Sequence, residues 1–307
     1  MVGRFAPSPT GYLHLGSLVA AMASWLDVRA QRGRWLIRIE DLDGPRGVPG
    51  SADDILATLA AYGFCWDGPI VRQSERDALY RQAFERLQAR GLIYPCGCTR
   101  REVEEAGFAP VASSRPHGPP AAAVYPGTCR QGLPAGRPAR AWRMRVPDRA
   151  VVFRDRAAGL VTQDLAREVG DFVVRRADGP WAYQLAVVVD DGAQGVTDVV
   201  RGADLLDSTP RQRWLQEALG LTPPRTLHVP LVLDAAGDKL AKQNGATPLS
   251  RERPLPSLHA AARHLGLAIE DAISVDSFWE RATEAWATRW SSHLADETIV
   301  KGADRGG

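Results

Sequence analysis

The chain has 307 residues, of which 45% are hydrophobic, and this is enough to bury the core of one large domain or two modest domains. The formal net charge at pH 7 is only +2, so overall charge does not indicate a nucleic-acid partner, and any RNA-binding surface must be a local patch. The sequence has no run of about 18 apolar residues and no basic leader, so we expect a cytoplasmic protein without a membrane partner. Nothing in the composition indicates an oligomeric state.

The first predicted elements alternate between strand and helix. A short strand leads into a turn rich in proline and glycine over residues 4–17, and apolar residues at helical spacing follow it. Residues 35–39 predict a second strand, and Ser51 with two acidic residues after it predicts the start of another helix. Apolar runs at residues 185–189 and 227–233 predict two later strands. We therefore expect an α/β fold around a doubly wound parallel sheet.

The middle and the end of the chain have a different character. Residues 109–139 contain seven prolines among small residues, which predicts a long segment without regular structure. Beyond Pro254, apolar residues return at helical spacing and predict a small helical region, with a frayed tail over residues 301–307.

Two short segments have the composition of a phosphate-binding site. His14 and Gly16 lie where the proline- and glycine-rich turn opens the first helix, and the amides at a helix N-terminus can face an anion. Lysine occurs only at positions 239, 242 and 301, whereas every other basic residue is arginine. Two lysines three residues apart, Lys239 and Lys242, indicate a site that requires compact ammonium charges.

These segments resemble the two signatures of class I aminoacyl-tRNA synthetases, HIGH and KMSKS, written here as HLGS at residues 14–17 and KLAKQ at residues 239–243. With RIEDLD at residues 38–43 and VRGADLL at residues 200–206, the chain resembles the glutamyl branch of that class. More narrowly, it resembles the glutamyl-Q tRNA(Asp) synthetases, which have a catalytic body and lack an anticodon-binding domain. The resemblance extends over residues 2–250.

The resemblance implies a class I synthetase fold in three parts. We expect a Rossmann-type catalytic domain with a parallel sheet over residues 1–90 and 180–245, and an inserted, zinc-containing, acceptor-type subdomain over residues 91–179. A helical C-terminal region occupies residues 246–307.

The implied ATP site contains His14, Gly16, Lys239 and Lys242, with His14 and Lys242 as the catalytic residues and Mg²⁺ accompanying the nucleotide. Such donors stabilise the negative charge that gathers on phosphate oxygens when pyrophosphate leaves. Ala241 stands where the signature has serine, and this removes one hydroxyl donor but leaves Lys242 in place. Taken singly, His14 also fits a core histidine and Lys242 a solvated loop lysine.

The implied glutamate site needs both basic and acidic partners, because glutamate carries two carboxylates and an ammonium group. Arg4 and Arg201 would hold carboxylates through paired N–H donors, and Glu40 would receive the ammonium. Ser8 and Tyr183 would add hydroxyl contacts. The structural alternative is that Arg4, Glu40 and Arg201 only form salt bridges within the fold.

Three of the four cysteines flank or enter the proline-rich segment, namely Cys96, Cys98 and Cys129. Three thiolates and one further donor would complete the tetrahedral shell that Zn²⁺ prefers, and a zinc ion would stabilise a segment that has little core of its own. Cys65 and His117 are the ordinary candidates for the fourth ligand, whereas the resemblance assigns the phenol oxygen of Tyr125. The alternative is that the cysteines are free thiols.

Residues 137–156 contain seven arginines with Trp142 and Phe153 among them. This pattern is typical of a surface that contacts RNA phosphates, and equally of a solvated basic pair of strands. The pattern does not identify any single residue that contacts RNA.

The resemblance implies that the chain activates L-glutamate with ATP as an adenylate and transfers the glutamyl group to queuosine in tRNA(Asp), rather than to a 3′-terminal adenosine. The stretch after the lysine segment is shorter than a typical anticodon-binding domain, which favours this acceptor. Two alternatives remain at this point: a truncated, discriminating glutamyl-tRNA synthetase that charges tRNA(Glu), and a ligand- or RNA-binding module without catalysis.

Overall fold

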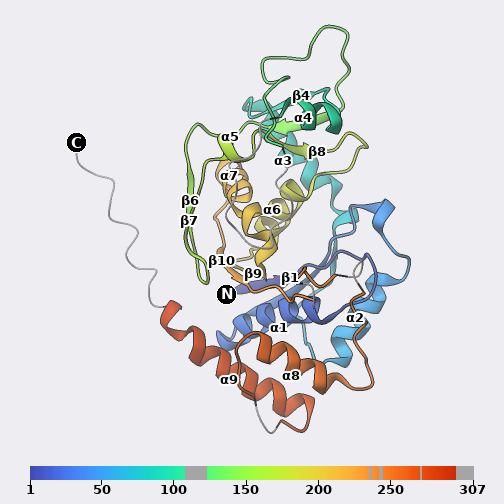
Figure 1. The fold of residues 1–307 in the computed structure, drawn as a ribbon, viewed down its shortest axis with the longest axis vertical. Helices are drawn as coiled ribbons and strands as arrows, with labels where there is room; N and C mark the ends of the chain where they lie inside the picture. The colour runs from blue at the N-terminus through green and yellow to red at the C-terminus, as the bar shows by residue number, and fades with distance from the viewer. Residues whose placement is uncertain (108–122, 235–236, 242–244, 270–271, 295–307) are drawn as a thin grey trace, which may run out of the picture.

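The computed structural model describes residues 1–107, 123–234, 237–241, 245–269 and 272–294 (Figure 1). Lys242, His117 and the tail at residues 301–307, which the sequence analysis singled out, lie outside these ranges. Within the described ranges, no helix is both long and apolar enough to cross a membrane.

Parallel strands form the centre of the molecule, in two sheets that lie side by side. In one sheet, β1 (Val2–Phe5), β2 (Arg34–Ile39) and β3 (Val71–Arg72) are parallel, and in the other β9 (Asp198–Gly202), β10 (Arg225–Val229) and β6 (Val151–Asp155) are parallel. Strand β7 (Gly159–Gln163) adds to β6 in the antiparallel sense. Strands β1 and β9 are neighbours, and Thr197 N donates to Val2 O at 2.9 Å. The strand order therefore reverses between β1 and β9, where α/β proteins bind ligands at the carboxyl ends of their strands.

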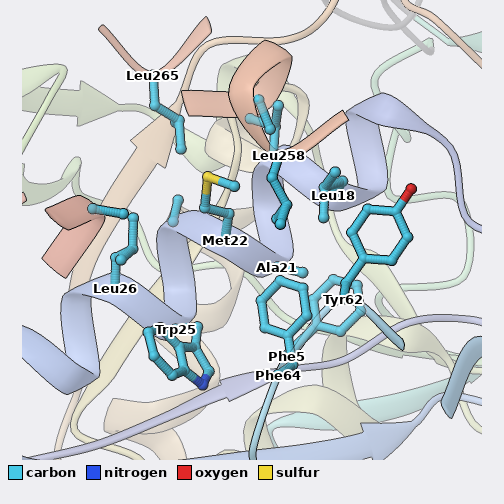
Figure 2. Close-up of a cluster of buried hydrophobic side chains, with 14 of the residues drawn as sticks. Phe5, Leu18, Ala21, Met22, Trp25, Leu26, Tyr62, Phe64, Leu258 and Leu265 are labelled. Atoms are coloured by element: carbon cyan, nitrogen blue, oxygen red, sulfur yellow. The ribbon is translucent and has the colours of Figure 1, made fainter. Parts of the chain in front are cut away.

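Helix α1 (Leu15–Ala30) is covered on both sides. One side faces β1, β2 and β9, and the other packs against α8 (Pro254–His264) and α9 (Val275–Leu294), as the lower part of Figure 1 shows. In Figure 2, Leu18, Met22 and Leu26 of α1 lie beside Leu258 and Leu265. A helix that is enclosed in this way must be apolar on nearly all of its faces. The C-terminal helices thus close the core beneath the site.

Helices α3 (Asp77–Ala89), α6 (Tyr183–Ala193) and α7 (Thr209–Leu219) pack together above the parallel strands (Figure 1). The prediction of a strand at residues 185–189 is wrong, because these residues lie in α6. They are buried on every side, so they have no polar face whose period distinguishes a helix from a buried strand. The strand that belongs to the sheet is β9, which follows α6.

A small antiparallel sheet, with strands β4 (Ile93–Cys96), β5 (Ala141–Met144) and β8 (Phe172–Arg175), lies beyond these helices. Helices α4 (Arg100–Ala106) and α5 (Leu165–Glu168) accompany it. Residues 137–156 contain two strands, as the second interpretation of the basic segment has it, but the two strands do not pair with each other, because β5 joins this sheet and β6 joins β10. The remaining elements are α2 (Ser51–Ala61) and the short 3₁₀ turns η1 (Gly44–Arg46), η2 (Gln73–Glu75) and η3 (Ala203–Ser208).

Candidate active site

A cavity of about 790 Å³ opens at the carboxyl ends of β1, β2, β9 and β10. The structure brings eight predicted site residues to its wall although they are scattered over the sequence. They are Arg4, Ser8, His14, Gly16, Glu40, Tyr183, Arg201 and Lys239. The ninth member of the implied ATP and glutamate sites, Lys242, lies outside the described residues.

His14 is the N-cap of α1, and its Nδ1 accepts a hydrogen bond from Gly16 N at 3.1 Å. A neutral imidazole that accepts at Nδ1 carries its proton on Nε2. The cap therefore uses one amide that was expected to face an anion and determines which imidazole nitrogen is the donor. Gly16 permits this arrangement, because a Cβ at that position would lie only 3.1 Å from His14 Cε1.

The lysine segment lies next to the start of α1. Leu240 N donates to Val232 O at 2.8 Å, and its own carbonyl would lie 3.7 Å from a Cβ on Gly16. The Lys239 side chain is half-exposed, and its Nζ lies 2.5 Å from Asp204 Oδ2. The two segments that define the implied ATP site are thus adjacent in space.

Arg4 and Glu40 are held by a buried group of charges that sequence reasoning missed. Arg4 Nε donates to Asp191 Oδ1 at 3.1 Å, and Arg38 donates to Asp191 at 2.8 Å and to Glu40 at 3.1 Å. Burial raises the pKa of the Glu40 carboxyl, while Arg38 and Arg4 oppose that rise. Burial alone would lower the pKa of Arg38, but Asp191, Glu40 and Asp190 together raise it. An arginine between apolar residues near the end of β2 was the available signal for Arg38.

Arg201 has neutral partners only. Its Nε donates to His228 Nε2 at 3.0 Å, and its Nη2 donates to Thr209 at 2.9 Å and to Gln212 at 2.8 Å. Its Nη1 lies 3.4 Å from the hydroxyl of Tyr183. Arg201 is only 5% exposed, and no carboxylate of the described residues lies within ion-pair distance of it. The salt-bridge alternative therefore describes Arg4, which pairs with Asp191, and Glu40, which pairs with Arg38, and it does not describe Arg201.

A buried guanidinium that has no carboxylate within ion-pair distance among the described residues indicates a binding site for an anion. Transfer of a charge from water into a protein interior is costly unless that charge is paired. Burial lowers the pKa of Arg201 from its ordinary value, which is the electrostatic sign of the same cost. A carboxylate bound in the cavity next to Nη1 would pair with this charge and offset the cost of burying it.

Three thiols gather beside the antiparallel sheet. The Sγ atoms of Cys96, Cys98 and Cys129 all lie within 4.8 Å of one another, and Cys98 and Cys129 are 3.7 Å apart. The Tyr125 hydroxyl lies 3.3 Å from Cys96 Sγ and 3.9 Å from Cys98 Sγ. Tetrahedral zinc with bonds of ordinary length spaces two sulfur ligands by about 3.8 Å, and a sulfur and an oxygen ligand by about 3.6 Å. The donor set and its spacing therefore fit a tetrahedral metal ion.

Cys65 is not part of this cluster. It is exposed and follows α2, where its carbonyl accepts hydrogen bonds from Trp25 at 3.0 Å and from Arg29 at 2.8 Å. Among the described residues, the thiol cluster thus contains three of the four cysteines.

The family model for class I tRNA synthetases (E and Q), catalytic domain, matches residues 1–253. The glutamyl-Q tRNA(Asp) synthetase of Burkholderia cenocepacia is 60% identical over 294 residues, which cover 94% of this chain and 96% of that relative. The protein of the same name from Bordetella bronchiseptica is 58% identical over 96% of this chain and 91% of its own length. A solved glutamate tRNA ligase from Elizabethkingia meningosepticum, in complex with its amino acid, has a TM-score of 0.73 at 25% identity and covers 96% of this chain and 69% of that chain. The chain belongs to the glutamyl-Q tRNA(Asp) synthetase family.

Proposed function

We propose that the chain activates L-glutamate with ATP and transfers the glutamyl group to queuosine in tRNA(Asp). The observation that carries this proposal is the buried, unpaired charge of Arg201 in the same cavity as Glu40 and His14. The names of the most similar relatives support the same substrate and acceptor. ATP and tRNA as substrates place the reaction in the cytoplasm.

The glutamate pocket has charges of both signs. Arg201 and Arg4 bind carboxylates, and Glu40 binds the ammonium group. Ser8 and Tyr183 add hydroxyl contacts from the cavity wall. Because Asp191 already forms an ion pair with Arg4, Arg201 supplies the guanidinium whose charge has no ion-pair partner among the described residues.

In the first step, a glutamate carboxylate oxygen attacks the α-phosphorus of ATP, and the bond to the β-phosphate breaks so that pyrophosphate leaves with the electron pair. His14 and Lys242 stabilise the charge that develops on the phosphate oxygens, and Gly16 and Lys239 help to bind the nucleotide. Mg²⁺ would neutralise part of the phosphate charge. In the second step, a hydroxyl of the queuosine diol attacks the glutamyl carbon and loses its proton, and AMP leaves.

Cys96, Cys98, Tyr125 and Cys129 would hold one Zn²⁺ in the insertion at residues 91–179, between the two parts of the catalytic body at residues 1–90 and 180–245 and ahead of the helical region at 246–307. Four protein donors fill a tetrahedral shell, so the ion has no open position for substrate. We assign it a structural role.

Glutamate-dependent exchange of labelled pyrophosphate into ATP, without added tRNA, tests the activation step. The proposal predicts exchange with glutamate and much less with glutamine. A binding module without catalysis would bind ATP or RNA and show no exchange. A truncated glutamyl-tRNA synthetase would instead place the amino acid on the 3′ end of tRNA(Glu).

A further inference from the structure

Three charged or polar side chains lie on one face of neighbouring parallel strands. In the register of the sheet, Arg201 of β9 lies opposite His228 of β10, and Asp155 of β6 lies opposite Thr226. Residues 226 and 228 share a face, because side chains alternate along a strand. The sheet thus places Asp155, His228 and Arg201 in a row that ends at the cavity, and each is no more than 5% exposed.

Asp155 determines where His228 carries its proton. Its Oδ1 accepts from the backbone amides of Ala157 and Ala158, each at 3.0 Å, and its Oδ2 lies 2.6 Å from His228 Nδ1. Burial opposes ionisation, but these hydrogen bonds and His228 hold the pKa of Asp155 at about 2. An ionised carboxylate can only accept, so Nδ1 of His228 must be the donor.

His228 Nε2 is then an acceptor. Burial and the charge of Arg201 lower the pKa of His228, whereas Asp155 and the more distant Asp204 oppose that change. The neutral ring directs the Nε2 lone pair at Arg201 Nε, which lies 3.0 Å away. If the His228 ring carried a second proton, its Nε2–H would point at the N–H of Arg201 Nε, and neither group could accept a hydrogen bond.

The N–H groups of Arg201 can be accounted for one by one. Nε donates to His228, and the two Nη2 hydrogens are used by Thr209 and Gln212 of α7. The Nη1 edge remains, and it points to Tyr183 on the cavity wall. Arg201 has five N–H donors in a rigid plane, so an acceptor at Nε determines which edge meets the cavity.

We propose that His228, oriented by Asp155, is a positioning residue that holds the Nη1 edge of Arg201 toward the glutamate carboxylate. This inference rests on the proposed glutamate site and extends it to two residues outside the motifs that define the family resemblance. Neither residue lines the cavity itself.

Two substitutions at one position separate positioning from packing. His228→Asn keeps a donor for Asp155 but has no acceptor that reaches Arg201, whereas His228→Gln places its Oε1 near the former position of Nε2. In pyrophosphate exchange we expect His228→Asn to raise the KM for glutamate about tenfold or more, with the KM for ATP and kcat within about twofold of wild type. His228→Gln should recover most of the loss.

A purely structural role predicts a different pattern, in which both variants lose thermal stability and the folded fraction keeps the wild-type KM for glutamate. That result would overturn the inference. If wild type itself shows no glutamate-dependent exchange, the proposed function fails instead, so the two failures are distinguishable.

A second measurement needs no variant. Imidazole ¹⁵N shifts of wild type at neutral pH should show His228 protonated at Nδ1 and unprotonated at Nε2. Protonation at Nε2 would contradict the inference even if the variants did not fold.

Discussion

The cavity and the thiol cluster keep their side chains in place by different means. Around the cavity, Arg4, Glu40 and Arg201 are held by other side chains of a large core, among them Arg38 and Asp191. Around the cysteines, the buried cluster formed by the described residues has four members, Tyr94, Cys96, Tyr125 and Cys129. A site held by a large core can be ordered before any ligand binds, whereas a small segment rich in proline gains its order from a metal ion. Metal removal or a substitution at one of the two sites should therefore leave the other site unchanged.

Metal removal should have the largest effect, and it should stay local. Zinc binding supplies about 10 kcal/mol or more in small structural sites, so chelation or Cys98→Ser should remove hydrogen-exchange protection from β4 and β5. No described residue between positions 91 and 179 lines the cavity, so glutamate-dependent exchange of pyrophosphate should persist.

Cys65→Ser is the matched control, because this exposed cysteine lies outside the cluster. It should leave metal content and protection unchanged. One full equivalent of zinc in Cys98→Ser would contradict the assignment of Cys98 as a zinc ligand. Loss of glutamate activation together with the metal would contradict the independence of the two sites.

Loss of a charge beneath the cavity should have the next largest effect. Asp191→Asn leaves Arg4 without its buried counter-charge and removes one of the three carboxylates around Arg38, and breaking a buried pair costs about 3–5 kcal/mol. Denaturant unfolding should show this loss of stability. Pyrophosphate exchange should show a raised KM for glutamate. Asp53→Asn is the control, since Asp53 is 82% exposed in its pair with Arg72 and should change stability by less than about 1 kcal/mol. If both substitutions lowered the free energy of unfolding by the same amount, the buried Asp191 would not stabilise the fold more than the exposed Asp53.

Arg201→Met should act on binding more than on folding. It removes the buried unpaired charge together with the hydrogen bonds to His228, Thr209 and Gln212, so we expect kcat/KM for glutamate to fall about 100-fold, with only a modest decrease in the unfolding midpoint. Arg225→Met, in the neighbouring strand and paired with Asp198 away from the cavity, should leave the KM for glutamate unchanged. A normal KM in Arg201→Met would remove this residue from the glutamate site.

Lys239→Ala should have the smallest effect of the four. The lysine is 50% exposed and pairs with Asp204, so its loss should raise the KM for ATP by about tenfold or less and leave the KM for glutamate unaltered. Titration of ATP in the exchange assay measures this change, and Lys301→Ala serves as a control on the loss of a lysine. A raised KM for glutamate instead would place Lys239 in the other half of the cavity.

The parallel strands and the shared cavity could be predicted because short motifs preserve the order of Arg4, His14, Glu40, Arg201 and Lys239 along the chain. Their roles in catalysis stay predictions. The helix α6 could not be predicted, since a run of buried apolar residues has no period.

Residues that are far apart in the sequence and are brought together only by strand pairing could not be predicted as partners either. Asp155 and His228 are 73 residues apart, and a single histidine in an apolar strand has the pattern of an ordinary core residue. The same holds for the basic segment at residues 137–156, whose strands are distributed between two sheets by tertiary pairing.

The identity of the glutamyl acceptor decides whether the proposed function is right. Labelled glutamate, ATP and the chain are incubated with tRNA(Asp) that either contains or lacks queuosine, and the label is located by nuclease cleavage. We predict label on the anticodon-stem fragment of the queuosine-containing tRNA and none on the tRNA without it. Label on the 3′ end of tRNA(Glu), or no transfer to queuosine-containing tRNA(Asp) despite active pyrophosphate exchange, would contradict the proposed function.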